Sequence, residues 1–264
     1  MFIINDLKKD ICEELVKMDK NVLITGSTGS GKSSFCLEVA KTLNMKPFMF
    51  NIGSTQDARL SLVGSHELKN GETNFVYSSF VKAIQEPNSL IILDELSRGS
   101  DDAFNILFPL LDFRKTLEID ETNEIVHVAE GVRFIATANI GSEYSATRSL
   151  DRALEDRFMT FNLEYITGTE LYNYASSIQD LTEKQEKSLE HLCSVFDFVN
   201  KLYDDDEIST RISPRIVLNC VGLFEKFSFT DVFDTIVASY FESEASVSSE
   251  LNTVKMFLDT QGIY

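Results

Sequence analysis

The stretch GSTGSGKS at positions 26 to 33 constrains the fold of this chain more than any other feature. An apolar run, Val22 to Ile24, ends one residue before it, and a helical pattern, SSFCLEVAKTLN, overlaps and follows it. The stretch fits G-x-x-x-x-G-K-[ST] placed between a strand and a helix, the setting in which such a loop binds phosphate. The motif therefore predicts an α/β domain with a phosphate-binding loop at the end of a buried strand.

Each residue type in this loop has a physical task. Glycines let the backbone wrap closely around phosphates with its N–H groups pointing inward, and the start of a helix adds positive potential. We expect Lys32 to neutralise the β- and γ-phosphates and the Ser33 hydroxyl to bind Mg²⁺. The predicted nucleotide-binding residues are Gly26, Ser27, Thr28, Gly29, Ser30, Gly31, Lys32, Ser33 and Ser34.

A second polar element follows the apolar run SLIIL of residues 89 to 93. A continuous apolar run is typical of a strand buried on both faces, and ligands of α/β sheets bind at the carboxyl ends of such strands. Here the run ends in Asp94 and Glu95. We expect Asp94 to hold the metal together with Ser33, and Glu95 to act as a general base on water.

Strands and helices alternate over roughly the first 160 residues, in the runs NVLITG, PFMFNI, SLIILDE and VRFIATAN. Such alternation predicts a parallel sheet covered by helices on both faces. Beyond about residue 165 only helical stripes follow, for example Leu189, Leu192, Cys193 and Phe196. We therefore expect a nucleotide-binding core over residues 1–164 and a small helical domain over residues 165–264.

Two stretches interrupt the alternation, and both predict hairpins. In SHELKNGETNFVY the Asn70-Gly71 pair favours a two-residue turn, which requires positive φ. In KTLEIDETNEIVHVAEG two alternating runs flank a polar turn at about Glu121 to Asn123. Both hairpins should project from the core, although an ordinary extension of a sheet edge is the alternative.

Charge and cysteine usage bear on partners and compartment. The formal net charge is −18, and an acidic surface repels nucleic-acid backbones. The four cysteines, Cys12, Cys36, Cys193 and Cys220, show no metal-type pairing, so free thiols in a reducing compartment are expected. No run is apolar and long enough to span a membrane. These features favour a cytoplasmic protein that does not bind membranes, and they make a nucleic-acid partner less favoured than a protein partner.

From about Asn21 to Phe224 the order and spacing of these motifs resemble the AAA+ ATPases. Within them the chain is most similar to the MoxR-like group, the helix-2-insert clade that includes the CbbQ, cobaltochelatase, McrB and midasin modules. The resemblance implies a P-loop AAA+ αβα core with two inserted hairpins facing a ring pore and a helical lid. It also implies ATP and Mg²⁺ as cofactors, and for Asn139 the sensor 1 role of orienting the attacking water together with Glu95.

Two arginines carry further roles by resemblance. The segment LDRALEDRFMTFNL, residues 150 to 163, is similar to the family helix that ends in D-R-F, so Arg157 matches the arginine finger that completes a neighbouring subunit's site. Arg148 or Arg152 could share that role, and ion pairs on the helix surface are the alternative for these arginines. Arg215, in ISPRIVLN, resembles the sensor 2 arginine of the lid, and Arg211 is its nearby alternative.

The function implied is a ring-forming ATPase, hexameric when active, that remodels a protein partner in the manner of a chaperone. MoxR-like proteins commonly work with a von Willebrand A-type adaptor. The alternatives are a nucleic-acid motor of the McrB kind, a chelatase motor subunit, a structural nucleotide holder, and GTP in place of ATP. One departure is Leu96-Ser97-Arg98, where the family usually has Ile-Asn-Arg.

Overall fold

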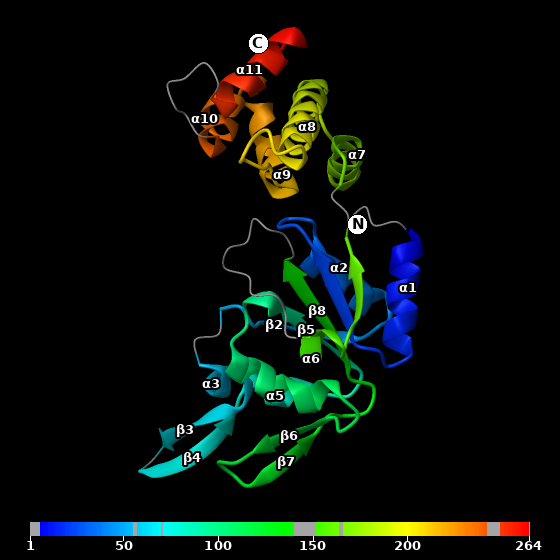
Figure 1. Cartoon of the computed structure of the whole chain (residues 1–264), viewed down its shortest axis with the longest axis vertical. Coiled ribbons are helices and arrows are strands. Elements are labelled where there is room, and N and C mark those ends of the chain that lie inside the picture. The colour runs from blue at the N-terminus through cyan, green and yellow to red at the C-terminus, as the bar shows by residue number, and fades with distance from the viewer. Residues whose placement is uncertain are drawn as a thin grey trace. The chain divides into compact units, whose positions relative to one another are not determined.

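The computed structural model describes residues 6–54, 57–69, 71–139, 152–163, 166–241 and 249–263. Its contacts divide the chain into two compact units, the larger built mainly from residues 4–164 and the smaller mainly from residues 165–264 (Figure 1). Among the described residues, none of the helices combines the length and the apolar character that crossing a membrane requires.

A five-stranded sheet forms the centre of the larger unit. All four strand pairings are parallel, and the order is β2 (Lys46–Asn51), β5 (Ser89–Asp94), β8 (Arg133–Asn139), β1 (Val22–Gly26) and β9 (Met159–Asn162). The first four are the runs that the sequence predicts. The fifth, β9, was not foreseen, because its four residues are mostly exposed and carry no apolar pattern.

Helices cover both faces of this sheet (Figure 1). On one face α1 (Asp6–Lys17) and α2 (Lys32–Thr42) pack on Leu90 and Ile92 of β5. On the other face α3 (Ala58–Leu62), α4 (Ser79–Ile84) and α5 (Asp101–Leu111) pack on Ile91 and Leu93. Because successive side chains of a strand point to opposite faces, a continuous apolar run feeds both cores. The predicted α/β class is confirmed.

Two antiparallel hairpins extend together from this core, as predicted (Figure 1). One pairs β3 (Gly64–Lys69) with β4 (Glu72–Tyr77), and Lys69 faces Glu72 across a turn in which Gly71 has φ 84°. Asn70 lies outside the described residues. The other pairs β6 (Thr116–Ile119) with β7 (Glu124–His127), with Asn123 at φ 53° in its turn.

Among its described residues the smaller unit contains helices, short 3-10 turns and connecting segments, and no strand. Its α-helices are α7 (Gly168–Ile178), α8 (Glu183–Asp204), α9 (Pro214–Val221), α10 (Phe229–Thr235) and α11 (Glu250–Thr260). The predicted stripes form its core, since Leu189, Leu192, Val217 and Phe224 are all at most 1% exposed. Reciprocal side-chain caps at Thr167 and Thr182 fix the starts of α7 and α8.

All four cysteines are free and buried, as the sequence predicts. Burial raises the pKa of the Cys12 thiol and of the Cys193 thiol to about 12. It also raises the pKa values of Cys36 and Cys220. A thiol with so high a pKa holds its proton at neutral pH, which makes these cysteines packing residues of low reactivity.

Candidate functional site: a phosphate loop beside two strand ends

The glycine-rich loop joins β1 to α2 in the conformation that the motif predicts. Gly29 and Gly31 have φ values of 80° and 87°, a left-handed region that disfavours side chains, and α2 begins directly after Gly31. Lys32 is 8% exposed, and its Nζ donates hydrogen bonds to the carbonyl oxygens of Gly26 at 3.0 Å and Ser27 at 2.7 Å. The loop therefore closes on its own lysine.

Burial lowers the pKa of the Lys32 amine to about 8, although the carboxylates of Asp94 and Glu95 act to raise it. A buried ammonium group held mainly by neutral carbonyl oxygens is energetically costly. An anionic phosphate beside Lys32 would compensate its charge at short range. The residues of the loop are thus suited to bind a nucleoside triphosphate.

The predicted metal ligands, Ser33 and Asp94, lie in direct contact. The Ser33 hydroxyl donates to Oδ1 of Asp94 at 2.7 Å, and the Thr137 hydroxyl on the neighbouring strand β8 donates to the same oxygen at 2.6 Å. The Thr137 oxygen in turn accepts the backbone N–H of Glu95 at 3.1 Å. Two elements far apart in the sequence are thereby joined at the carboxyl edge of the sheet.

Thr137 is a site residue that the sequence reasoning missed. It is 1% exposed and sits within the apolar strand VRFIATAN. A hydroxyl in such a strand needs a buried partner, so this polar residue in an apolar run was the available signal.

Glu95 has an unusual backbone, with φ 55° and ψ 41° at the end of β5. Its Oε2 lies 3.4 Å from the donor Nδ2 of Asn51 and 3.7 Å from the guanidinium of Arg98. Gly53 gives it room, because a Cβ there would be 3.1 Å from Oε2 of Glu95. Asn51 was also missed, although it ends the strand PFMFN just as Asn139 ends its own strand.

Asn139 lies beside the start of the phosphate loop. It is the last residue of β8, 8% exposed, and it pairs in register with Gly26 of β1. The structure thus brings Gly26, Lys32, Ser33, Asp94, Glu95 and Asn139 together on one edge of one sheet.

Arg157 lies near the amino-terminal ends of β1 and β9, whereas the phosphate loop follows the carboxyl end of β1. Asn21, immediately before β1, donates its Nδ2 to the backbone oxygens of Arg157 at 3.0 Å and Leu111 at 2.7 Å. Because β1 and β9 run parallel from this point, the full length of β1 separates Arg157 from the phosphate loop of its own chain. The structure does not bring Arg157 to that loop.

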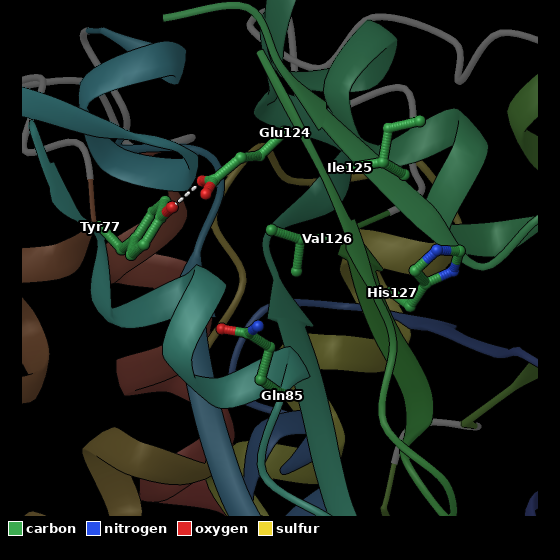
Figure 2. A pocket seen from close by; sticks show the side chains of 6 residues that line it. All are labelled: Tyr77, Gln85, Glu124, Ile125, Val126 and His127. Atoms are coloured by element: carbon green, nitrogen blue, oxygen red, sulfur yellow. Dashed lines mark hydrogen bonds between the residues drawn. The ribbon is translucent and has the colours of Figure 1, made fainter. Parts of the chain in front are cut away.

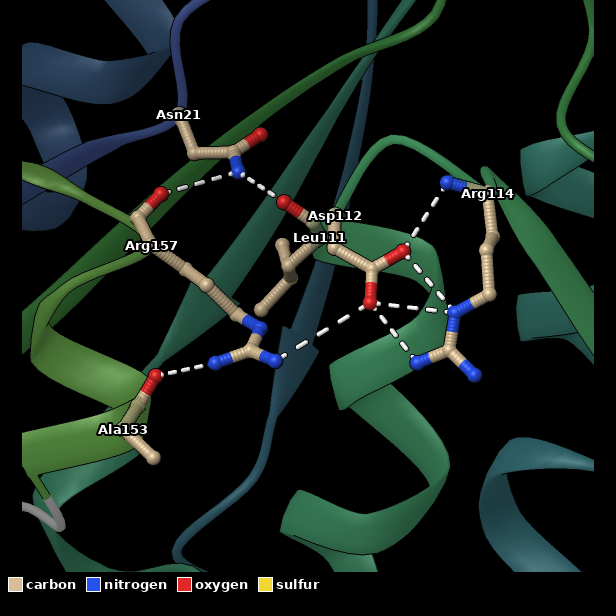
Figure 3. A network of polar contacts seen from close by, with 6 residues as sticks. All are labelled: Asn21, Leu111, Asp112, Arg114, Ala153 and Arg157. Carbon is tan, nitrogen blue, oxygen red and sulfur yellow. Dashed lines mark hydrogen bonds and ion pairs between the residues drawn. The ribbon is translucent and has the colours of Figure 1, made fainter.

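The Arg157 side chain is half-buried, and its guanidinium is held by contacts within its own chain. It lies 4.7 Å from the ring centre of Phe108. It also donates to the Ala153 carbonyl and has its Nη2 3.9 Å from Asp112 (Figure 3). Asp112 also accepts hydrogen bonds from the side chain of Arg114, at 2.7 Å to Nη2. The hydrogen bonds from Arg114, with a smaller contribution from Arg157, lower the pKa of Asp112.

The remaining candidate arginines lie elsewhere. Arg152 is exposed on the short helix α6 (Arg152–Glu155), and Arg148 is outside the described residues. In the smaller unit Arg215 is exposed on the first turn of α9, while Arg211 pairs with Asp204 at 3.2 Å. Ser213 occupies the N-cap position of α9, but its side chain makes no capping hydrogen bond.

Across the described part of the chain, no three histidine, cysteine, aspartate or glutamate side chains gather into a metal cluster. A metal at Ser33 and Asp94 would therefore need water and phosphate oxygens as further ligands. That pattern is typical of Mg²⁺ in nucleotide sites and untypical of zinc, which takes a dedicated protein cage.

Comparison with known proteins decides the family. Residues 21–158 match the model described as "AAA domain (dynein-related subfamily)". The chain belongs to this AAA family. It is accordingly an AAA+ ATPase by family, in which nucleotide is bound with a divalent metal and subunits generally oligomerise.

The chain is also similar to other proteins over most of its length. The protein named "Putative chaperone BssE" from Thauera aromatica is 33% identical over 199 residues, which cover 75% of this chain and 67% of the relative. An uncharacterized protein of Staphylococcus aureus is 25% identical over 260 residues, 96% of this chain and 95% of that protein. The crystal structure of NtrX from Brucella abortus shares the fold, with a TM-score of 0.57 at 14% identity over 84% of this chain and 50% of NtrX.

Proposed function

We propose that this AAA protein is a MoxR-like ATPase that hydrolyses ATP with Mg²⁺ in a ring, hexameric when active, and remodels a protein partner. One observation carries the proposal. The Ser33 and Thr137 hydroxyls converge on one oxygen of Asp94, with Glu95 attached to the same network through its backbone N–H.

The proposed roles follow from this geometry. Residues 26–34 hold the phosphates, and Ser33 and Asp94 hold Mg²⁺, which neutralises phosphate charge when it is bound. Glu95 accepts a proton from water, a task compatible with a side chain that is 33% exposed. Asn139, next to the loop, orients that water.

We further propose that Arg157 acts on the site of a neighbouring subunit. Its position at the sheet edge opposite its own phosphate loop supports a role in trans. A ring follows from such a role, because each subunit then lacks an arginine that only its neighbour supplies. In the same proposal residues 165–264 serve as the lid, and Arg215 reports the nucleotide to it.

A protein is the substrate we favour over a nucleic acid. The net charge of −18 disfavours a phosphate backbone, and two hairpins project from the core where a partner chain can reach them (Figure 1). A relative named as a chaperone is consistent with this choice. A von Willebrand A-type adaptor and a cytoplasmic location, which suits the free thiols, complete the proposal.

Mixing two inactive variants tests the proposal. Glu95→Gln removes the base of its own site but keeps Arg157, whereas Arg157→Ala removes the arginine but keeps its own base. Each alone should bind ATP and lose turnover, and a mixture should regain activity because mixed neighbours rebuild complete sites. Glu86→Gln, on the surface of the same unit, is the matched control and should retain full activity.

Light scattering gives the mass of the ring that Glu95→Gln forms with ATP. Full turnover by Arg157→Ala, or a mixture that stays inactive while rings form, would reject the role in trans. ATP turnover with DNA or RNA added, against turnover with an adaptor added, separates the two classes of substrate.

A further inference from the structure

The two hairpins are tied to each other and leave a groove between them. Tyr77, the last residue of β4, donates its hydroxyl to Glu124 of β7. Arg59 of α3 holds the turn of the second hairpin through Glu121, with N–O distances of 2.6 and 2.7 Å. A pocket of about 440 Å³ lies beside β7, lined by Tyr77, Gln85, Glu124, Ile125, Val126 and His127 (Figure 2).

The hydrogen-bond register shows which backbone groups of β7 face away from β6. Val126 lies opposite Leu117, and Val128 donates its N–H to Lys115 at 2.9 Å. Bonded and non-bonded pairs alternate in an antiparallel ladder, so Val126 bonds to β6 while Ile125 and His127 direct their N–H and C=O groups outward. These are the groups that a further strand would use.

Just beyond β7, the same edge of the strand makes one backbone hydrogen bond within the chain. Ala129, two residues after His127, donates its N–H to the carbonyl of Ile84 at 2.9 Å. That bond closes one end of the groove, and the Tyr77 side chain lies at the other. Between them β7 offers four residues, about 13 Å of strand edge.

The two sides of this edge differ in chemistry. Glu124 and Val126 point to the side of Tyr77 and Gln85, whereas Ile125 and His127 point away from them (Figure 2). Val126 is 6% exposed and belongs to the core, but Ile125 is 59% exposed. Glu118 is exposed opposite Ile125, and no lysine or arginine lines the pocket. An added strand would place basic side chains on the side of Glu124 and Gln85 and apolar ones on the other side, beside the exposed Ile125.

We propose that the outer edge of β7 binds an extended segment of a partner protein by strand addition, with apolar residues alternating with basic ones. Backbone hydrogen bonds to Ile125 and His127 provide the affinity, and Glu124 selects the charge. The inference rests on the proposed function, since the outer edge of β7 would be the site at which the remodelling ATPase binds its protein substrate. Peptide binding itself requires neither nucleotide nor hydrolysis.

The test uses the full chain without nucleotide and a fluorescent eight-residue peptide of alternating lysine and valine, capped at both ends. Anisotropy should report saturable binding, and a peptide of alternating glutamate and valine should bind at least tenfold more weakly. His127→Pro deletes one outward N–H and should weaken binding about tenfold, whereas His127→Ala should match the wild type. Proline is tolerated there because that N–H makes no bond to β6.

Circular dichroism and ATP affinity establish that His127→Pro folds. If His127→Pro does not fold, binding of N-methylated lysine–valine peptides to the wild type is measured instead. One peptide carries N-methyl groups on its odd residues and the other on its even residues, so that each lacks the N–H groups of one edge. One of the two should not bind. The proposal is overturned by an unbound lysine–valine peptide, by wild-type affinity in His127→Pro, or by equal affinity for the acidic peptide. A change of mass in His127→Pro with unchanged peptide binding would also overturn it, because the edge would then pair with a second copy of the chain. ATP turnover measured separately keeps failure of this site distinct from failure of the ATPase.

Discussion

Replacing Thr137 with valine removes a hydroxyl while keeping nearly the same shape. That hydroxyl is buried and donates to the Asp94 carboxylate at 2.6 Å, a bond to a charged group worth about 1.5–3 kcal/mol. It also accepts the N–H of Glu95 at 3.1 Å, which the valine leaves without this partner for about 1 kcal/mol more. We expect the free energy of unfolding of the larger unit to fall by about 3 kcal/mol in Thr137→Val.

Urea unfolding without nucleotide measures this loss, and Thr137→Ser is the matched control. Serine keeps the hydroxyl and loses one methyl group, so it should cost about 1 kcal/mol. Equal losses in the two variants would refute the reasoning, because packing alone would then account for the effect. The valine variant should also bind ATP with Mg²⁺ more weakly, since Asp94 and Glu95 lose their common support.

Three further outcomes are expected. The hydrogen bond from Arg59 lowers the pKa of Glu121 to about 2. The stabilisation by this ion pair is therefore complete above pH 4.5 and is lost as the pH falls towards 2, so the free energy of unfolding of Glu121→Gln should fall less steeply with acid in pH titrations. The Cys12 thiol, with a pKa of about 12, should resist alkylation at pH 8 in the native protein and react within minutes in urea, as mass spectrometry can count. Asp112→Asn should lower the free energy of unfolding by at most about 1 kcal/mol, because Arg114 and Arg157 lose a shared carboxylate in ion pairs that are partly open to solvent; a raised urea midpoint would contradict this.

Most of the sheet was predictable because four of its strands are short apolar runs that can be recognised in the sequence alone. The run SLIIL is apolar on both faces of the strand, so it is buried only when helices cover both faces of the sheet. The turns at Gly71 and Asn123 need positive φ, which glycine and asparagine adopt readily. Strand β9 gave no such signal. Its register is set by Met159 bonding to Asn21, a contact 138 residues away that no local pattern records.

The residues of the site also fall into those that a local motif predicts and those that only the folded structure reveals. Lys32 and Ser33 follow from a motif, and Asp94 follows from the end of an apolar strand. Thr137 and Asn51 act through neighbours on other strands, so their importance appears only when the strand order is known. The anchoring of Arg157 by Phe108 and Asp112 is likewise a product of packing, since these residues are distant in sequence.

The left-handed backbone of Glu95 has a consequence for attempts to engineer this protein. A side-chain-bearing residue in that conformation costs about 1–2 kcal/mol, which glycine would not incur. Selection of variants for heat resistance alone would therefore drive position 95 towards glycine. The chain would gain stability and lose the carboxylate that we propose as the general base, so at this one position stability and ATP turnover would be traded against each other.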